Sequence, residues 1–139
     1  MNIKCLKMHP KAIVPVKPKE GDAGFDLASV EDVTLCPGET KKVATGLAFE
    51  PPENVWLEAK TRSGMATEGI HVLCGVIDSG YRGEIKIVLH NHGRRVYRVK
   101  PGDRIAQMVP RVLYYPVFEV VERLGRSARG ANGFGSSGK

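Results

Sequence analysis

The sequence predicts an all-β protein, a sandwich or barrel, built as a single domain. Short alternating or purely apolar stretches recur along the chain, and turn-forming residues separate them. At 139 residues the chain has the length of one domain. Many short strands with regular turns are typical of sandwiches and barrels. The predicted strands cover residues 33–35, 41–49, 55–61, 72–77, 84–90, 105–110 and 112–121.

Proline and glycine mark the turns between these strands, as in CPGE (36–39) and KPGD (100–103), where they preset the turn geometry. One helical turn is predicted over residues 63–68, with Ser63 as its N-cap. The composition changes at Gly125, after which no aliphatic side chain is larger than alanine. Such a segment buries little surface. We therefore expect a β domain over residues 1–124 and a mobile C-terminal arm over 125–139.

Charge and cysteine content limit the class of partner and the compartment. The formal net charge of +6 favours anionic partners such as nucleotides, nucleic acid or an acidic membrane surface, without choosing among them. The spacing of Cys5, Cys36 and Cys74 matches no zinc site, which indicates reduced thiols. No apolar stretch has the length of a membrane span or of a signal core. We expect a cytoplasmic protein, or a nuclear one in a eukaryote, that does not enter membranes.

Two segments could bind phosphate groups. The sequence RSGMA (62–66) places Arg62, Ser63 and Gly64 at a helix start, where free N–H groups suit an anion; an ordinary N-cap is an equal alternative. In GDRIAQ (102–107), Gln107 either presents its amide to a phosphate or faces solvent.

Two aspartates stand in contexts that suit an active site. In AGFDL (23–27), Asp26 lies between apolar neighbours, so a buried carboxylate would need a partner such as Arg62; an edge aspartate is the alternative. In GVIDSGYRG (75–83), Asp78 follows a strand and precedes a turn. Aspartate in a turn is usually structural. The functional alternative is a general base that takes a proton from water, with Tyr81 as a flat wall against a sugar.

The C-terminal segment contains the phosphate-loop spacing G-x-x-x-x-G-K over residues 133–139, but no predicted strand leads into it and no helix follows. The functional interpretation is a lid over a bound nucleotide. Arg129 would contact a phosphate, Phe134 would stack on a flat ring, and the glycine and serine residues would close on the polyphosphate. A plain flexible terminus and an RG-rich tail that binds nucleic acid are the alternatives.

Three of the histidines are candidate metal ligands. His90 and His92 share one strand face, and His71 lies elsewhere in the chain. Because no carboxylate stands at a suitable spacing, we expect no protein metal site.

Together these five segments resemble the motifs of the trimeric dUTPase family (dUTP pyrophosphatases), in the family's order and across residues 22–138. The fifth motif is RGANGFGSSG (129–138). The resemblance implies a jelly-roll-like fold and hydrolysis of dUTP to dUMP and pyrophosphate by attack of water on the α-phosphorus. That reaction limits uracil incorporation into DNA and supplies dUMP for thymidylate synthesis. The resemblance also implies Mg²⁺ held mainly by the triphosphate. It further implies a homotrimer with shared active sites, in which each site takes motifs one, two and four from one chain, motif three from a second chain and motif five from a third.

The resemblance further implies the roles of single residues. Asp78 and Asp26 are the implied catalytic carboxylates; Asp78 activates the attacking water, and Asp26 supports the site by pairing with Arg62. Backbone groups of residues 73–75 would read the uracil edge, and Tyr81 would pack under the deoxyribose. The implied substrate-binding residues are Arg62, Ser63, Gly64, Leu73, Cys74, Gly75, Val76, Tyr81, Gln107, Arg129, Phe134, Gly135 and Ser136.

Some positions depart from the family pattern. Gly80 stands where many members have an acidic residue, and Val72 and Cys74 also differ near the base-reading backbone. The dCTP deaminase family shares the fold, but the context of Tyr81 and the C-terminal motif favour dUTPase. A regulator that binds partner proteins stays open as a second role. An RNA-binding tail would give salt-sensitive binding independent of Asp78; we expect no direct binding of nucleic acid.

Overall fold

The computed structural model describes residues 1–16 and 19–133. These residues form antiparallel strands and one short helix, which confirms the predicted all-β class. None of the described helices is long and apolar enough to cross a membrane. The elements are β1 (Lys4–Lys7), β2 (Phe25–Ala28), β3 (Val33–Leu35), β4 (Thr40–Ala44), β5 (Leu47–Glu50), β6 (Val55–Lys60), α1 (Ser63–Thr67), β7 (Ile70–Val72), β8 (Val76–Ile77), β9 (Lys86–Asn91), β10 (Tyr97–Val99) and β11 (Arg104–Val112).

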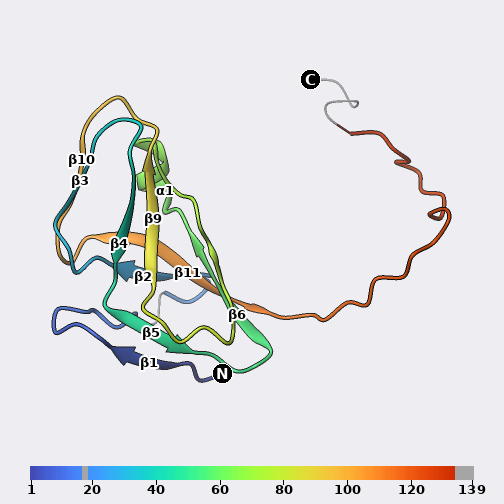
Figure 1. Ribbon diagram of the computed structural model, residues 1–139, viewed down its shortest axis with the longest axis horizontal. Coiled ribbons are helices and arrows are strands. Elements are labelled where there is room, and N and C mark those ends of the chain that lie inside the picture. The colour runs from blue at the N-terminus through green and yellow to red at the C-terminus, as the bar shows by residue number, and fades with distance from the viewer. Residues whose placement is uncertain (17–18, 134–139) are drawn as a thin grey trace.

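Two main sheets form the body. One has the strand order β2-β11-β6-β8, and the other has the order β4-β9-β7. The pairs β1-β5 and β10-β3 extend this framework. In Figure 1, β4 and β9 stand in front while β2 and β11 cross behind them, so the two sheets face each other.

The core lies between these sheets. Strand β9 alternates, with Ile87 and Leu89 buried and Lys86 exposed, as expected when one face of a strand meets the core. The opposite sheet contributes Leu27, Leu57 and Ile105, also almost fully buried. Burying each such aliphatic side chain stabilises the fold by about 1.5–3 kcal/mol.

Several predicted strand boundaries were wrong. The stretch 41–49 is two strands, because the chain turns at Gly46, whose φ of 66° lies in the left-handed region. The stretch 72–77 is also divided, into the end of β7 and the short β8. Strands β1, β2 and β10, which are 3 or 4 residues long, were not predicted.

The predicted helical turn is confirmed, but its cap is not. The N-cap residue is Arg62, in an extended conformation and without a side-chain cap hydrogen bond, whereas Ser63 is the first helical residue. The first N–H groups of α1 are therefore left without a side-chain acceptor.

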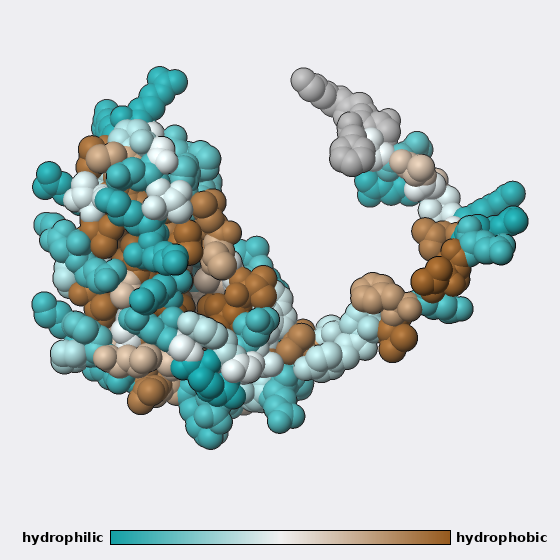
Figure 2. All heavy atoms as spheres, viewed as in Figure 1, coloured by the Kyte–Doolittle hydropathy of each residue, from teal (hydrophilic) through white to brown (hydrophobic). Residues whose placement is uncertain are grey.

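The predicted strand over 112–121 was wrong: β11 ends at Val112, and residues 113–133 contain no strand. This segment runs away from the sheets in Figure 1, and apolar side chains are visible along it in Figure 2. Val117, Phe118 and Val120 are each at least 90% exposed. Exposed apolar stretches of this kind are uncommon on the surface of a monomer. The chain thus leaves the body well before Gly125, and the predicted boundary at residue 124 stays a prediction.

Candidate active site

Strand β11 brings three of the predicted segments together. Gln107 pairs with Asp26 on β2 and with Lys60 on β6, and Arg62 follows β6 two residues later. The Gln107 amide donates from Nε2 to the carbonyl of Thr61 over 3.1 Å. This hydrogen bond fixes the amide beside the end of β6.

Asp26 holds two arginines at this end of the sheet. Its Oδ1 accepts from Nε of Arg62 at 2.7 Å, which confirms the predicted pair. Its Oδ2 accepts from Nη1 of Arg104 at 3.1 Å. Sequence reasoning missed Arg104, because only the pairing of β11 with β2, with its register shift between Arg104 and Ala106, brings this side chain to Asp26. With Asp26 bound to both, each guanidinium keeps further N–H groups for an anion.

These residues line a cavity of about 860 Å³, called here the basic cavity. Its charged lining groups are three cations and two carboxylates, so the local balance favours an anionic ligand. Ser63 and Gly64 of α1 also line it, together with an apolar stretch over residues 13–16 that the sequence did not single out. Its charged and amide side chains are Lys19, Asp22, Asp26, Arg62, Arg104 and Gln107.

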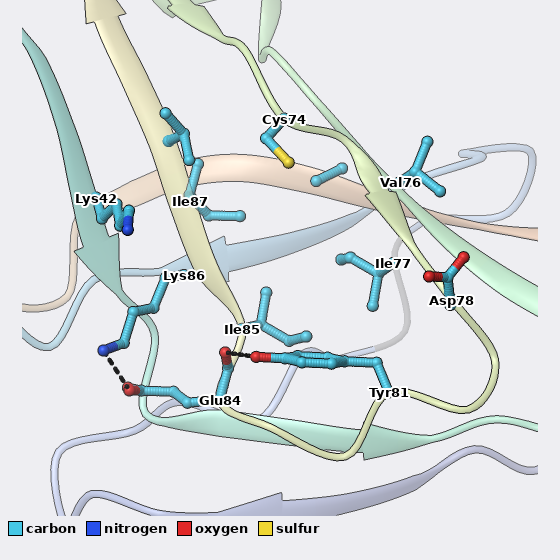
Figure 3. A pocket seen from close by; sticks show the side chains of 12 residues that line it. Lys42, Cys74, Val76, Ile77, Asp78, Tyr81, Glu84, Ile85, Lys86 and Ile87 are labelled. Atoms are coloured by element: carbon cyan, nitrogen blue, oxygen red, sulfur yellow. Dashed lines mark hydrogen bonds and ion pairs between the residues drawn. The ribbon is translucent and has the colours of Figure 1, made fainter.

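Asp78 stands at the rim of a second cavity of about 470 Å³, called here the hairpin cavity. Strand β8 pairs with β6 through Ile77 and Leu57, and Asp78 follows β8 directly. The N–H of Tyr81 donates to the Asp78 carbonyl at 3.0 Å and closes a turn. This confirms the predicted place of Asp78 at a strand end, and Figure 3 shows Asp78 and Tyr81 on the same loop.

The backbone of residues 73–75 is tied to both sheets. The Leu73 N–H donates to Val88 at 2.9 Å, and the Gly75 carbonyl accepts from Ala59 at 2.7 Å. Among the described residues, neither the N–H nor the C=O of Cys74 has a hydrogen-bond partner. Because Cys74 lines the hairpin cavity, as does Val76, the peptide groups of Cys74 are available to bind a ligand there.

Some lining residues of the hairpin cavity were not predicted. Lys42 comes from β4 and Lys86 from β9, and both lie on the side opposite Asp78 in Figure 3. Lys86 Nζ is 3.6 Å from Oε2 of Glu84. No local pattern marks these residues, because only the pairing of β4 with β9 places them here.

The two cavities share no lining residue. One chain therefore does not bring Asp78 and the basic groups into one cavity. Arg129 lines neither; its Nε donates to the Asn132 carbonyl at 2.9 Å within the extended segment. The predicted ligands Phe134, Gly135 and Ser136 lie outside the described residues.

The described part of the chain contains no group of three or more His, Cys, Asp or Glu residues placed to hold a metal ion. The ring centroids of His90 and His92 are 4.1 Å apart, and Nδ1 of His90 lies 2.7 Å from the Thr40 hydroxyl. The three cysteines are free thiols, as predicted, and burial raises the pKa of the Cys5 thiol.

An antiparallel β fold with an arginine-lined cavity and an aspartate that lines a second cavity suits a hydrolase that acts on a phosphorylated substrate. The dUTPase family model matches residues 10–138. The deoxyuridine 5'-triphosphate nucleotidohydrolase of Clostridioides difficile is 44% identical over 99% of this chain and 98% of its own length. That of Picosynechococcus sp. is 43% identical over 99% of both. The chain belongs to the dUTPase family.

Solved structures agree with this assignment. The dUTPase of Staphylococcus bacteriophage 80alpha, as a G164S mutant with dUpNHpp, matches with a TM-score of 0.91 and 28% identity over 99% of both chains. The predicted jelly-roll-like β fold is thereby confirmed. The protein is an enzyme that hydrolyses dUTP to dUMP and pyrophosphate.

Proposed function

We propose that Asp78 is the general base of dUTP hydrolysis and that it activates the water that attacks the α-phosphorus. The supporting observation is its place directly after β8, at the rim of the hairpin cavity, on the loop that carries Tyr81. A carboxylate at a cavity rim can reach a bound water. Removal of a proton by a positioned base commonly accelerates a reaction by about 10²–10⁴-fold.

Arg62, Ser63, Gly64 and Gln107 bind the phosphates of dUTP in this proposal. Their shared lining of the basic cavity supports it, as does the carboxylate of Asp26, which orients Arg62. Fixed donors of this kind stabilise the charge that develops on the triphosphate in the transition state. Asp26 therefore acts through Arg62 rather than on the reacting atoms.

The hairpin cavity takes the nucleoside. The peptide groups of Cys74 are free to pair with the uracil edge, while Leu73 and Gly75 hold the hairpin through their bonds to Val88 and Ala59. The Tyr81 ring lies under the deoxyribose and leaves no room for a 2′-hydroxyl. Val76 lines the same cavity.

A homotrimer with shared sites completes this arrangement. Two features support it: the hairpin and basic cavities have no common residue within one chain, and residues 113–124 expose apolar side chains that a second copy would cover. Residues 125–139 form an arm that closes a site on another chain, with Arg129 at the phosphates and Phe134, Gly135 and Ser136 over the nucleotide. dUTP is the ligand, and the bacterial relatives support a cytoplasmic location.

Mg²⁺ enters with the triphosphate in this proposal. Mg²⁺ typically binds through substrate phosphates, waters and one or two carboxylates. The basic cavity fits this pattern, since it offers cations for phosphate and only Asp22 and Asp26 as carboxylates, the second of which already holds two arginines. When bound, Mg²⁺ would offset negative charge on the phosphate oxygens.

Chelation of Mg²⁺ is expected to lower dUTP turnover and to weaken binding of a non-hydrolysable dUTP analogue, while binding of dUMP stays unchanged, because dUMP has no polyphosphate to hold the ion. Calorimetry with and without EDTA measures both affinities. Equal weakening for dUMP would place the ion in a protein site and contradict the proposal.

Substrate choice tests the nucleoside assignment. Pyrophosphate release should be far faster from dUTP than from dTTP, dCTP or UTP measured in parallel. Release of ammonia from dCTP would indicate the deaminase reaction instead.

Replacing Asp26 with asparagine should reduce kcat/KM for dUTP by about 100-fold, because a misplacement of about 1 Å in a positioning group can cost that much. The matched control is Glu58→Gln. Glu58 also bridges two cations, Lys60 at 2.7 Å and Arg111 at 2.9 Å, which hold its carboxyl pKa below the usual value, but it lines neither cavity. Equal losses in both variants would mean that Asp26 contributes only to stability.

A further inference from the structure

The ring of Tyr81 lies directly against Gly83. A Cβ atom added at Gly83 would fall 2.6 Å from Cζ of Tyr81 and 3.0 Å from Cε2, and it would overlap Oη. Carbon atoms in contact normally stay about 3.5 Å apart or more. The ring can occupy its place only because residue 83 has no side chain.

The far end of the ring is tied by a hydrogen bond. The Tyr81 hydroxyl donates to the carbonyl of Glu84 at 3.2 Å, which is drawn in Figure 3. Glu84 is itself anchored, because its Oε1 accepts from the N–H of Gly46 at 3.0 Å across the fold. The carbonyl that receives the hydroxyl is thus held by a distant turn rather than by the loop alone.

The rest of the loop is also braced. Nη1 of Arg82 donates to the carbonyls of Ser79 and Tyr81, at 2.7 and 3.1 Å. Tyr81 is nevertheless 48% exposed, so packing covers only part of this residue. The position of the ring therefore depends on the contact with Gly83 and on the Glu84 carbonyl.

We propose that Gly83 is a positioning residue for sugar discrimination: together with the Glu84 carbonyl, it seats the Tyr81 ring at the depth that admits deoxyribose and excludes ribose. The inference rests on the proposed function, in which this ring is the wall under the sugar. A methyl group at residue 83 displaces the ring by about 1 Å, and rates are sensitive to shifts of that size.

Gly83→Ala tests this inference through the ratio of kcat/KM for dUTP to kcat/KM for UTP. We expect the ratio to fall by about 100-fold. The matched control is Gly80→Ala on the same loop, where an added Cβ meets nothing within 4 Å and φ is not positive; its ratio should stay at the wild-type value. A wild-type ratio in Gly83→Ala would overturn the inference.

A double-mutant cycle separates seating of the ring from a general effect on the loop. In a Tyr81→Ala background, Gly83→Ala should cause no further fall in the ratio, because no ring is left to displace. An equal further fall would overturn the inference. If Tyr81→Ala alone leaves the ratio unchanged, the proposed function of Tyr81 fails; if it lowers the ratio while Gly83→Ala does not, only the inference about Gly83 fails.

Tyr81→Phe provides a test that does not depend on how well Gly83→Ala folds. It keeps the ring and removes only the hydrogen bond to Glu84 from a half-exposed side chain. We expect an intermediate ratio, between those of the wild type and Tyr81→Ala, with unchanged thermal unfolding. A wild-type ratio would show that the Glu84 carbonyl does not seat the ring.

Discussion

Replacing Asp78 with asparagine is expected to lower kcat for dUTP by about 10²–10⁴-fold while nucleotide affinity stays within a few-fold of the wild type. Asparagine has nearly the same shape but cannot accept the proton of the attacking water. The loss should therefore appear in kcat and not in binding. Steady-state pyrophosphate release, together with calorimetric titration of a non-hydrolysable dUTP analogue, measures the two quantities separately.

The matched control is Asp32→Asn, since Asp32 is an exposed aspartate just before β3 and lines neither cavity. It should keep wild-type turnover. Near wild-type turnover in Asp78→Asn would show that another group takes the proton, whereas a parallel loss of affinity would indicate that the carboxylate only organises the loop.

The features of this protein that could be predicted are those determined by residues adjacent in the sequence. Asp78 could be placed at a strand end because an apolar pair precedes it and a Ser-Gly turn follows. The helical turn at Ser63 was found for the same reason. The all-β class followed from the recurrence of such local signals, which does not require knowing which strand pairs with which.

The unpredicted parts depend on contacts distant in sequence. Lys42 reaches the hairpin cavity only because β4 pairs with β9, and Arg104 reaches Asp26 only because β11 pairs with β2. The apolar stretch 113–121, beyond the end of β11, has the composition of a strand but pairs with no strand among the described residues. Its run of apolar residues indicates burial without saying in which molecule, because a surface covered by a second molecule is as apolar as a core strand.

Residues 125–133, the described part of the segment after residue 124, form no hydrogen bond or ion pair with the body. Their hydrogen bonds are local, such as Gly130 to Ser127 and Asn132 to Arg129. A chain ending at residue 124 should therefore unfold at the wild-type temperature. Its dUTP turnover should fall by about 100-fold or more, because the site loses Arg129 and Phe134 and stays open to water.

Turnover at the wild-type level in this truncated chain would mean that no arm closes the site. Arg129→Ala in the full-length chain is the finer test, since it removes one guanidinium and leaves the rest of the segment in place. It should lower turnover less than the truncation does, with unchanged unfolding.

Mixed trimers decide whether the arm serves its own chain or another. Asp78→Asn chains and chains ending at residue 124 should each be nearly inactive alone. When the two are co-expressed in equal amounts, each mixed trimer holds one site that joins an intact Asp78 from a truncated chain to an intact arm from an Asp78→Asn chain. Random assembly would then restore about a quarter of the wild-type sites. If the arm closed the site that holds its own Asp78, no pairing of these chains could recover activity, so the recovered fraction measures the sharing of the site directly.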